Sequence, residues 1–69
     1  MARTQGSRFW ANSYIVLKSG QKFYLEDYVS SIEDEIESSR SRVEFRIAST
    51  LSSSTIYLNP KDIDYFGSV

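Results

Sequence analysis

One stretch of the sequence, residues 25–39 (LEDYVSSIEDEIESS), has the spacing of an amphipathic helix and limits what the rest of the chain can form. Its apolar side chains recur at intervals of three and four residues and share one helix face: Leu25, Tyr28 or Val29, Ile32 and Ile36. The acidic side chains are mostly left for the opposite face. We expect Asp27 to cap the first turn, because a carboxylate accepts hydrogen bonds from free backbone N–H groups.

Short β-prone segments flank this helix on both sides. Residues 14–18 (YIVLK) and 21–25 (QKFYL) surround a turn at Ser19 and Gly20, which predicts a hairpin. Residues 42–48 (RVEFRIA) alternate strictly, and residues 55–58 (TIYL) follow a polar connection, residues 49–54. Pro60 ends that strand, because proline has no N–H for a ladder. Residues 63–66 (IDYF) form either a short fifth C-terminal strand or a segment packed on the helix. The sequence predicts an α+β fold of order ββαββ, with one helix on a small antiparallel sheet.

A sheet covered by one helix has a buried face and an open face, so alternation assigns each strand side chain to one of them. The predicted core consists of Ile15, Leu17, Phe23, Leu25, Val43, Phe45, Ile47, Ile56 and Leu58, beneath Val29, Ile32 and Ile36. The predicted open face consists of Tyr14, Val16, Lys18, Lys22, Tyr24, Arg42, Glu44, Arg46, Thr55 and Tyr57. A bulge in the first hairpin would exchange two residues on each face. The pattern also leaves open another strand order, or a small barrel in place of the open sheet.

The chain of 69 residues is long enough for one domain with a small core. We expect residues 1–12 to form a partly flexible arm, residues 13–66 to form the domain and residues 67–69 to fray. Phe9 and Trp10 have two interpretations. They either fold back and close one end of the core, or anchor the chain to another molecule, since tryptophan is favoured at interface hot spots.

The composition argues against catalysis. The chain has neither cysteine nor histidine, so the commonest nucleophile activation and metal ligation schemes are missing. Asn59, Asp62 and Asp64 lack the ligand alternation of a calcium loop, and the three glycines are too far apart for a phosphate loop. We therefore expect no enzyme activity, no metal, no cofactor and no small-molecule substrate.

Charge and hydropathy indicate where the chain works. The net charge is −1, which argues against non-specific binding to nucleic acid or to an anionic membrane. Six of the nine acidic residues lie between positions 26 and 37, so we expect an acidic helix side and basic surfaces elsewhere. No apolar run approaches the ~20 residues that span a bilayer, and no signal-peptide core follows Met1. A soluble, cytoplasmic protein is the expectation.

Three functions are compatible with this pattern. The preferred one is a non-enzymatic module that docks to a protein partner and self-associates, with its partner-binding residues predicted to be Trp10, Tyr14, Tyr24, Arg42, Arg46 and Tyr57. The second is binding of single-stranded nucleic acid by the open face, through Lys18, Lys22, Arg42 and Arg46. The third is an acidic decoy that imitates nucleic acid through Glu33, Asp34 and Glu37.

Two longer segments carry a resemblance. VLKSGQKFYLED places a Lys-Ser-Gly-Gln-Lys hairpin before an acidic helix, and TIYLNPKDIDYF closes a strand with Asn-Pro before a last isoleucine. Over residues 15–66 the chain resembles small accessory and inhibitor proteins encoded by bacterial phages and other mobile elements. The resemblance implies that genomic context and assigns no activity to individual residues.

Overall fold

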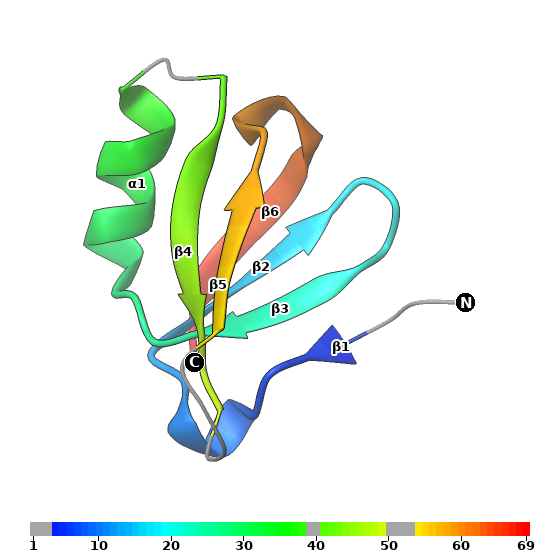
Figure 1. Cartoon of the computed structure of the whole chain (residues 1–69), viewed down its shortest axis with the longest axis vertical. Coiled ribbons are helices and arrows are strands. Elements are labelled where there is room, and N and C mark those ends of the chain that lie inside the picture. The colour runs from blue at the N-terminus through cyan, green and yellow to red at the C-terminus, as the bar shows by residue number, and fades with distance from the viewer. Residues whose placement is uncertain (1–3, 39–40, 50–53) are drawn as a thin grey trace.

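The computed structural model describes residues 4–38, 41–49 and 54–69. The described chain has one α-helix, six β-strands and two short 3-10 turns (Figure 1). In order they are β1 (Thr4–Gln5), η1 (Arg8–Trp10), β2 (Ser13–Leu17), β3 (Lys22–Leu25), α1 (Val29–Glu37), β4 (Val43–Ile47), β5 (Ser54–Leu58), η2 (Pro60–Asp62) and β6 (Ile63–Ser68). The predicted α+β class is confirmed. The ββαββ order corresponds to β2-β3-α1-β4-β5, β6 is the fifth strand that the sequence left open, and β1 is an additional strand that the sequence does not predict.

The strands form one sheet in the order β5-β4-β3-β2-β6, and β1 pairs with β3 in parallel. The first predicted hairpin is present as β2 and β3, with Ile15 opposite Phe23, and the second as β4 and β5, with Phe45 opposite Ile56. The last strand returns across the molecule to pair with β2. Consecutive antiparallel hairpins therefore build most of the sheet, as the sequence predicts.

The sheet is curved rather than flat. β3 and β4 are paired at one position, Leu25 with Ile47, so the two hairpins diverge beyond that point (Figure 1). Helix α1 contacts both β4 and β6, although β3 and β2 separate these strands in the sheet. The sheet therefore bends around a common core, and α1 covers the opening between its two halves.

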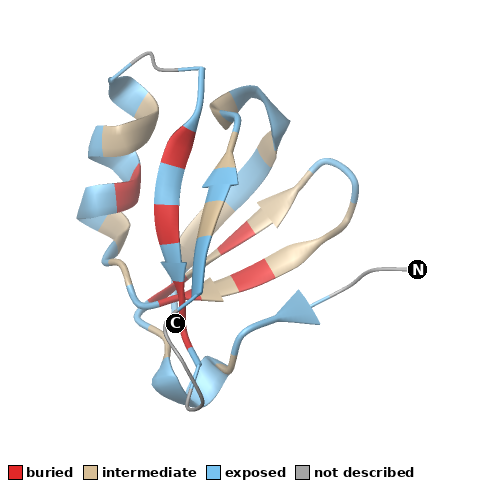
Figure 2. Cartoon of the chain, in the orientation of Figure 1, coloured by how far each residue is buried: buried red, intermediate tan, exposed pale blue. Residues whose placement is uncertain are grey.

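The core contains most of the residues expected from alternation, but Val29 is half-buried outside it, and Ala48, Ile63 and Phe66 are additional members or neighbours. Its fully or nearly buried apolar side chains are Ile15, Phe23, Leu25, Ile32, Val43, Phe45 and Ile47, and the half-buried Leu17, Ile36, Ile56, Leu58, Ile63 and Phe66 pack against them. Figure 2 shows buried and exposed residues alternating along β4. A register shift occurs between Val16 and Leu17, but Ile15 stays fully buried, so the two faces of the first hairpin are not exchanged.

The helix is shorter than the periodic stretch predicts. It begins at Val29, and its N-cap residue is Tyr28, which makes no side-chain capping bond. Leu25 belongs to β3 instead, because Ser13 on one side and Ile47 on the other hold its backbone in the sheet. The expected cap is wrong as well: Asp27 Oδ2 accepts a hydrogen bond from the backbone N–H of Arg46 at 2.7 Å. Asp27 thereby ties the segment before the helix to β4.

The C-terminal residues are paired with β2. Gly67 lies opposite Tyr14, Ser68 lies opposite Ser13, and the N–H of Val69 donates to the carbonyl of Asn12 at 3.3 Å. The expectation that residues 67–69 fray is therefore wrong. A Cβ on Gly67 would lie 2.9 Å from the hydroxyl oxygen of Tyr14, so glycine allows the tyrosine ring to lie across this strand. Residues 1–3 of the expected arm, residues 39 and 40, and residues 50–53 of the polar connection lie outside the described residues.

Candidate partner-binding surface

The turn η1 is attached to the body by backbone hydrogen bonds on both sides. Before it, the N–H of Ser7 donates to Ala48 at 2.8 Å; after it, the N–H of Asn12 donates to Leu25 at 2.9 Å. Gly6 has φ +88°, and a Cβ there would lie 2.6 Å from the carbonyl oxygen of Tyr24. Glycine is needed here because the chain adopts a left-handed conformation while it crosses close to β3. The turn is therefore held in place by bonds that do not involve its own side chains.

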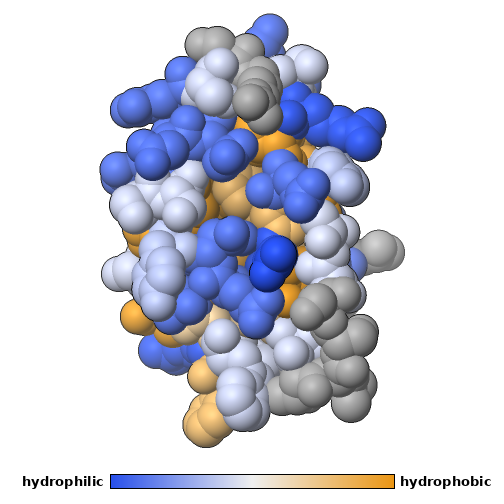
Figure 3. Space-filling view, turned by 60° about the vertical axis from the view of Figure 1, so that its left-hand side comes forward, coloured by the Kyte–Doolittle hydropathy of each residue, from blue (hydrophilic) through white to orange (hydrophobic). Residues whose placement is uncertain are grey.

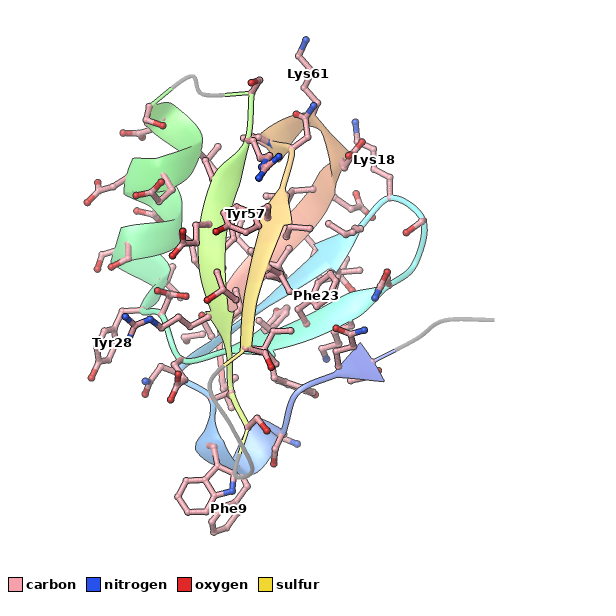
Figure 4. All side chains as sticks on the ribbon, viewed as in Figure 1. Phe9, Lys18, Phe23, Tyr28, Tyr57 and Lys61 are labelled. Carbon is pink, nitrogen blue, oxygen red and sulfur yellow. The ribbon has the colours of Figure 1, made fainter. Side chains whose placement is uncertain are left out.

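The two aromatic side chains of this turn face solvent. Phe9 is 85% exposed and Trp10 is 53% exposed, with ring centroids 5.3 Å apart in an edge-to-face arrangement. Figure 4 shows Phe9 at the far end of the molecule, directed away from the strands. The interpretation in which these rings close the core is wrong, because the core is filled by strand and helix side chains and the buried Ala48 lies where the turn is attached.

A second group of aromatic side chains lies on the outer face of β2, β3 and β6; we call Tyr14, Lys22, Tyr24 and Tyr65 the tyrosine–lysine cluster. Tyr14 and Tyr24 are direct cross-strand neighbours. Lys22 Nζ lies 4.9 Å from the ring centroid of Tyr14 and 4.8 Å from that of Tyr24. Tyr65 packs edge-to-face on Tyr14 at 6.2 Å. Cation–π and aromatic contacts thus organise this face.

Sequence reasoning did not include Tyr65 in the predicted site, because residues 63–66 had no assigned register. Alternation along these residues could have placed Tyr65 on the same face as the other tyrosines. In the structure Tyr65 lies opposite Val16 of β2, and Val16 also lies opposite Lys22 of β3.

The turn and the cluster adjoin each other. A hollow of 310 Å³ between them is lined by Arg8, Tyr14, Lys22, Tyr24, Ser68 and Val69. Arg8 belongs to η1 and is exposed, so this cation lies on the turn that carries Phe9 and Trp10 and also beside the tyrosines. Of the predicted partner-binding residues, Tyr14 and Tyr24 lie in this hollow and Trp10 lies two residues along the chain from Arg8.

The remaining predicted partner-binding residues lie elsewhere. Arg42 and Tyr57 form a separate pair over β4 and β5, with the guanidinium 4.5 Å from the ring centroid and Glu44 opposite Tyr57. A different hollow of 430 Å³ adjoins them and also includes Glu35 of α1. Arg46 is exposed opposite Thr55. The predicted open face is therefore divided, because β3 and β4 diverge. The sequence assigned faces by alternation alone, which carries no information on curvature.

The charged residues predicted for nucleic-acid binding and for an acidic decoy differ in how they are distributed. Lys18 is exposed beside the β2–β3 turn (Figure 4), whereas Lys22 lies over Tyr14 and Tyr24 and Arg42 lies over Tyr57. Glu33, Asp34 and Glu37 are all exposed on α1. Figure 3 shows the helix side of the molecule, where hydrophilic side chains surround smaller areas of hydrophobic surface. The cations predicted for nucleic acid are thus dispersed, while the acidic residues stay together on one element.

Within the described ranges, no group of three or more histidine, cysteine, aspartate or glutamate residues is placed to hold a metal ion. In the same ranges, every buried side-chain nitrogen or oxygen has a hydrogen-bond partner; the fully buried Ser13 donates to the carbonyl of Asp27. None of the helices formed by the described residues has the length and apolar character needed to cross a membrane.

No known protein family, curated protein or solved structure matches the chain.

Proposed function

We propose that this chain is a non-enzymatic protein-binding module, of the kind used as a regulator or inhibitor by phages and mobile elements. It docks to a protein partner, a second copy of itself included, through the turn η1 and the adjoining tyrosine–lysine cluster. The observation that carries the proposal is the exposed Phe9–Trp10 pair on a turn fixed by backbone hydrogen bonds. Neither ring belongs to the core cluster, and an exposed aromatic pair of this kind is typical of a binding surface.

The physical gain from docking is large for so small a surface. Burying the exposed parts of two aromatic rings contributes roughly 5 kcal/mol at ~25 cal/mol per Å², before the cost of association is subtracted. The anchored turn lowers that cost, since its backbone is already ordered. Arg8 and Lys22 line the hollow beside the turn and would meet acidic groups at the rim of a partner.

Protein binding is favoured over binding of single-stranded nucleic acid because cations cover the faces of the tyrosine rings. Bases stack on open aromatic faces, but Lys22 lies over Tyr14 and Tyr24, and Arg42 lies over Tyr57. Nucleic acid stays the second candidate because Arg8 and Lys22 line one hollow together with two tyrosines.

A capture experiment tests the proposal. The immobilised chain is compared with F9A/W10A and with Tyr28→Ala, a matched control whose ring is 66% exposed just before α1. Bound proteins are quantified by mass spectrometry. We expect a specific partner to be retained by the wild type and the control and reduced about ten-fold or more by the double variant. Equal capture by all three chains would contradict the proposal.

Charge reversal separates protein docking from nucleic-acid binding and from decoy action. If nucleic acid is the ligand, single-stranded oligonucleotides bind with an affinity that falls steeply with salt and is reduced by Lys22→Glu. If the chain is an acidic decoy, capture of its target is lost in E33K/D34K/E37K and unaffected by F9A/W10A. Either result would replace the proposed docking mode.

A further inference from the structure

A second apolar feature lies between α1 and β6, extends from Pro60 along β6, and shares Tyr65 with the tyrosine–lysine cluster. A hollow of 370 Å³ between α1 and β6, here called the α1–β6 groove, is lined by Ile36, Pro60, Ile63, Asp64, Tyr65 and Phe66. Ile36, Ile63 and Phe66 are half-buried and pack against the core. The groove is therefore an apolar depression supported by the core and open to solvent.

We propose that this groove receives the turn η1 of a second copy of the chain, with the Phe9–Trp10 pair inserted between α1 and β6. The inference rests on the proposed function, because it assigns an occupant to the same turn. Phe9 and Trp10 project as an edge-to-face pair, and the groove presents aliphatic and aromatic side chains of matching chemistry.

The charges around the two features are complementary. Arg8 is exposed beside the rings and forms no ion pair within the described part of the chain. The groove includes the exposed Asp64, and Glu33 lies three residues before Ile36, on the same side of the helix. The exposed Arg8 would thus meet Asp64 and Glu33, while the neighbouring cation, Lys61, is directed away from the molecule in Figure 4, and this charge pairing guides docking and fixes its orientation.

The geometry requires two molecules. Phe9 and Lys61 lie at opposite ends of the folded molecule in Figure 4, and the groove includes Pro60, which precedes Lys61 in the sequence. The backbone hydrogen bonds from Ser7 to Ala48 and from Asn12 to Leu25 hold the turn at its own end of the molecule, so it cannot reach the groove of its own chain. The contact therefore joins two different surfaces. Such head-to-tail contacts build rings or open chains rather than a closed two-fold dimer.

The test uses charge exchange, which leaves the core unchanged. Arg8→Glu places an acid against the acidic groove, and E33R/D64R places bases against Arg8, so each variant alone should associate about ten-fold more weakly than the wild type. In a mixture, each turn meets a groove of opposite charge, and association should return to the wild-type level. F9A/W10A should abolish it. Mass is measured by light scattering and sedimentation across a concentration series at low salt.

Each outcome is decisive. A wild-type mass that rises with concentration, weakened by each charge variant and restored by mixing, supports the inference. A wild-type chain that stays monomeric, or association that survives F9A/W10A, or variants that do not restore each other, overturns it. The proposed function fails separately, in the capture experiment: a monomeric wild type whose captured partner is lost in F9A/W10A overturns self-docking alone.

Discussion

The core and the turn η1 use the same residue types for opposite purposes. Phe45 is 1% exposed and Phe23 is 5% exposed, whereas Phe9 is 85% exposed. The buried pair lies at alternating positions of β3 and β4, so each ring enters the core with its strand. Phe9 lies in a turn whose backbone alone is bonded to the body. The number of aromatic residues therefore does not by itself indicate how stable the fold is. The position of each backbone segment determines which rings are buried and stabilise the fold and which stay exposed for binding.

The largest effect is expected in the core. Phe45→Ala removes a fully buried ring between the helix and the sheet and should lower the free energy of unfolding by about 3–5 kcal/mol. Because small domains are marginally stable, the variant should be largely unfolded at 37 °C or show a strongly reduced Tm. Chemical and thermal denaturation measure it. A loss below about 1 kcal/mol would show that Phe45 does not hold the core together.

The next effect concerns the attachment of the turn. Gly6→Ala should cost about 1–3 kcal/mol, because the residue has φ +88° and its Cβ would lie 2.6 Å from the backbone oxygen of Tyr24. Gly67→Ala is the matched control. Its Cβ meets the side chain of Tyr14, which can move, so a smaller loss is expected. Equal losses in denaturation would contradict the close crossing of the turn over β3.

The segment before the helix should have an intermediate effect. Asp27→Ala leaves the N–H of Arg46 without its carboxylate partner and should lower the free energy of unfolding by about 1–2 kcal/mol. Asp34→Ala removes an exposed carboxylate from α1 and should change stability by less than about 0.5 kcal/mol. Similar values for the two variants would show that Asp27 does not fasten this segment to β4.

The smallest effect on stability is expected at the turn itself. Phe9→Ala should change the free energy of unfolding by less than about 0.5 kcal/mol, since this ring is 85% exposed and lies outside the core, while it weakens partner capture. Equilibrium denaturation and the capture assay are run on the same preparation. A loss of stability comparable to that of Phe45→Ala would erase the distinction between the two regions.

Local pattern predicted most of the fold because burial follows alternation within each element. Ile15, Phe45 and Ile32 were assigned to the core from spacing alone, and each is buried. The pattern could not assign Leu25, which satisfies the helical spacing and the strand spacing equally. It also missed β1, because two residues paired in parallel with β3 have no periodicity to detect.

The candidate site was less predictable than the core. The sequence predicts Trp10, Tyr14 and Tyr24 as partner-binding residues, and the structure places Tyr14 and Tyr24 in one hollow with Arg8. Arg42 and Tyr57 were assigned to the same face but lie over another pair of strands. Alternation along a strand predicts on which face of the sheet a side chain lies. It does not predict how far two strands diverge.

The sequence by itself determined the α+β class, the order of the main elements and the identity of the core, because these depend on interactions between near neighbours along the chain. Only the tertiary structure decided that Leu25 joins the sheet, that the open face is divided and that Phe9 and Trp10 stay in solvent. Each of these depends on hydrogen bonds between distant segments: the N–H of Glu26 donates to Arg46, the N–H of Ala48 donates to Tyr24, and the N–H of Ser7 donates to Ala48. At these positions the backbone N–H and C=O groups form hydrogen bonds with segments far away in the sequence, which a local residue pattern does not predict.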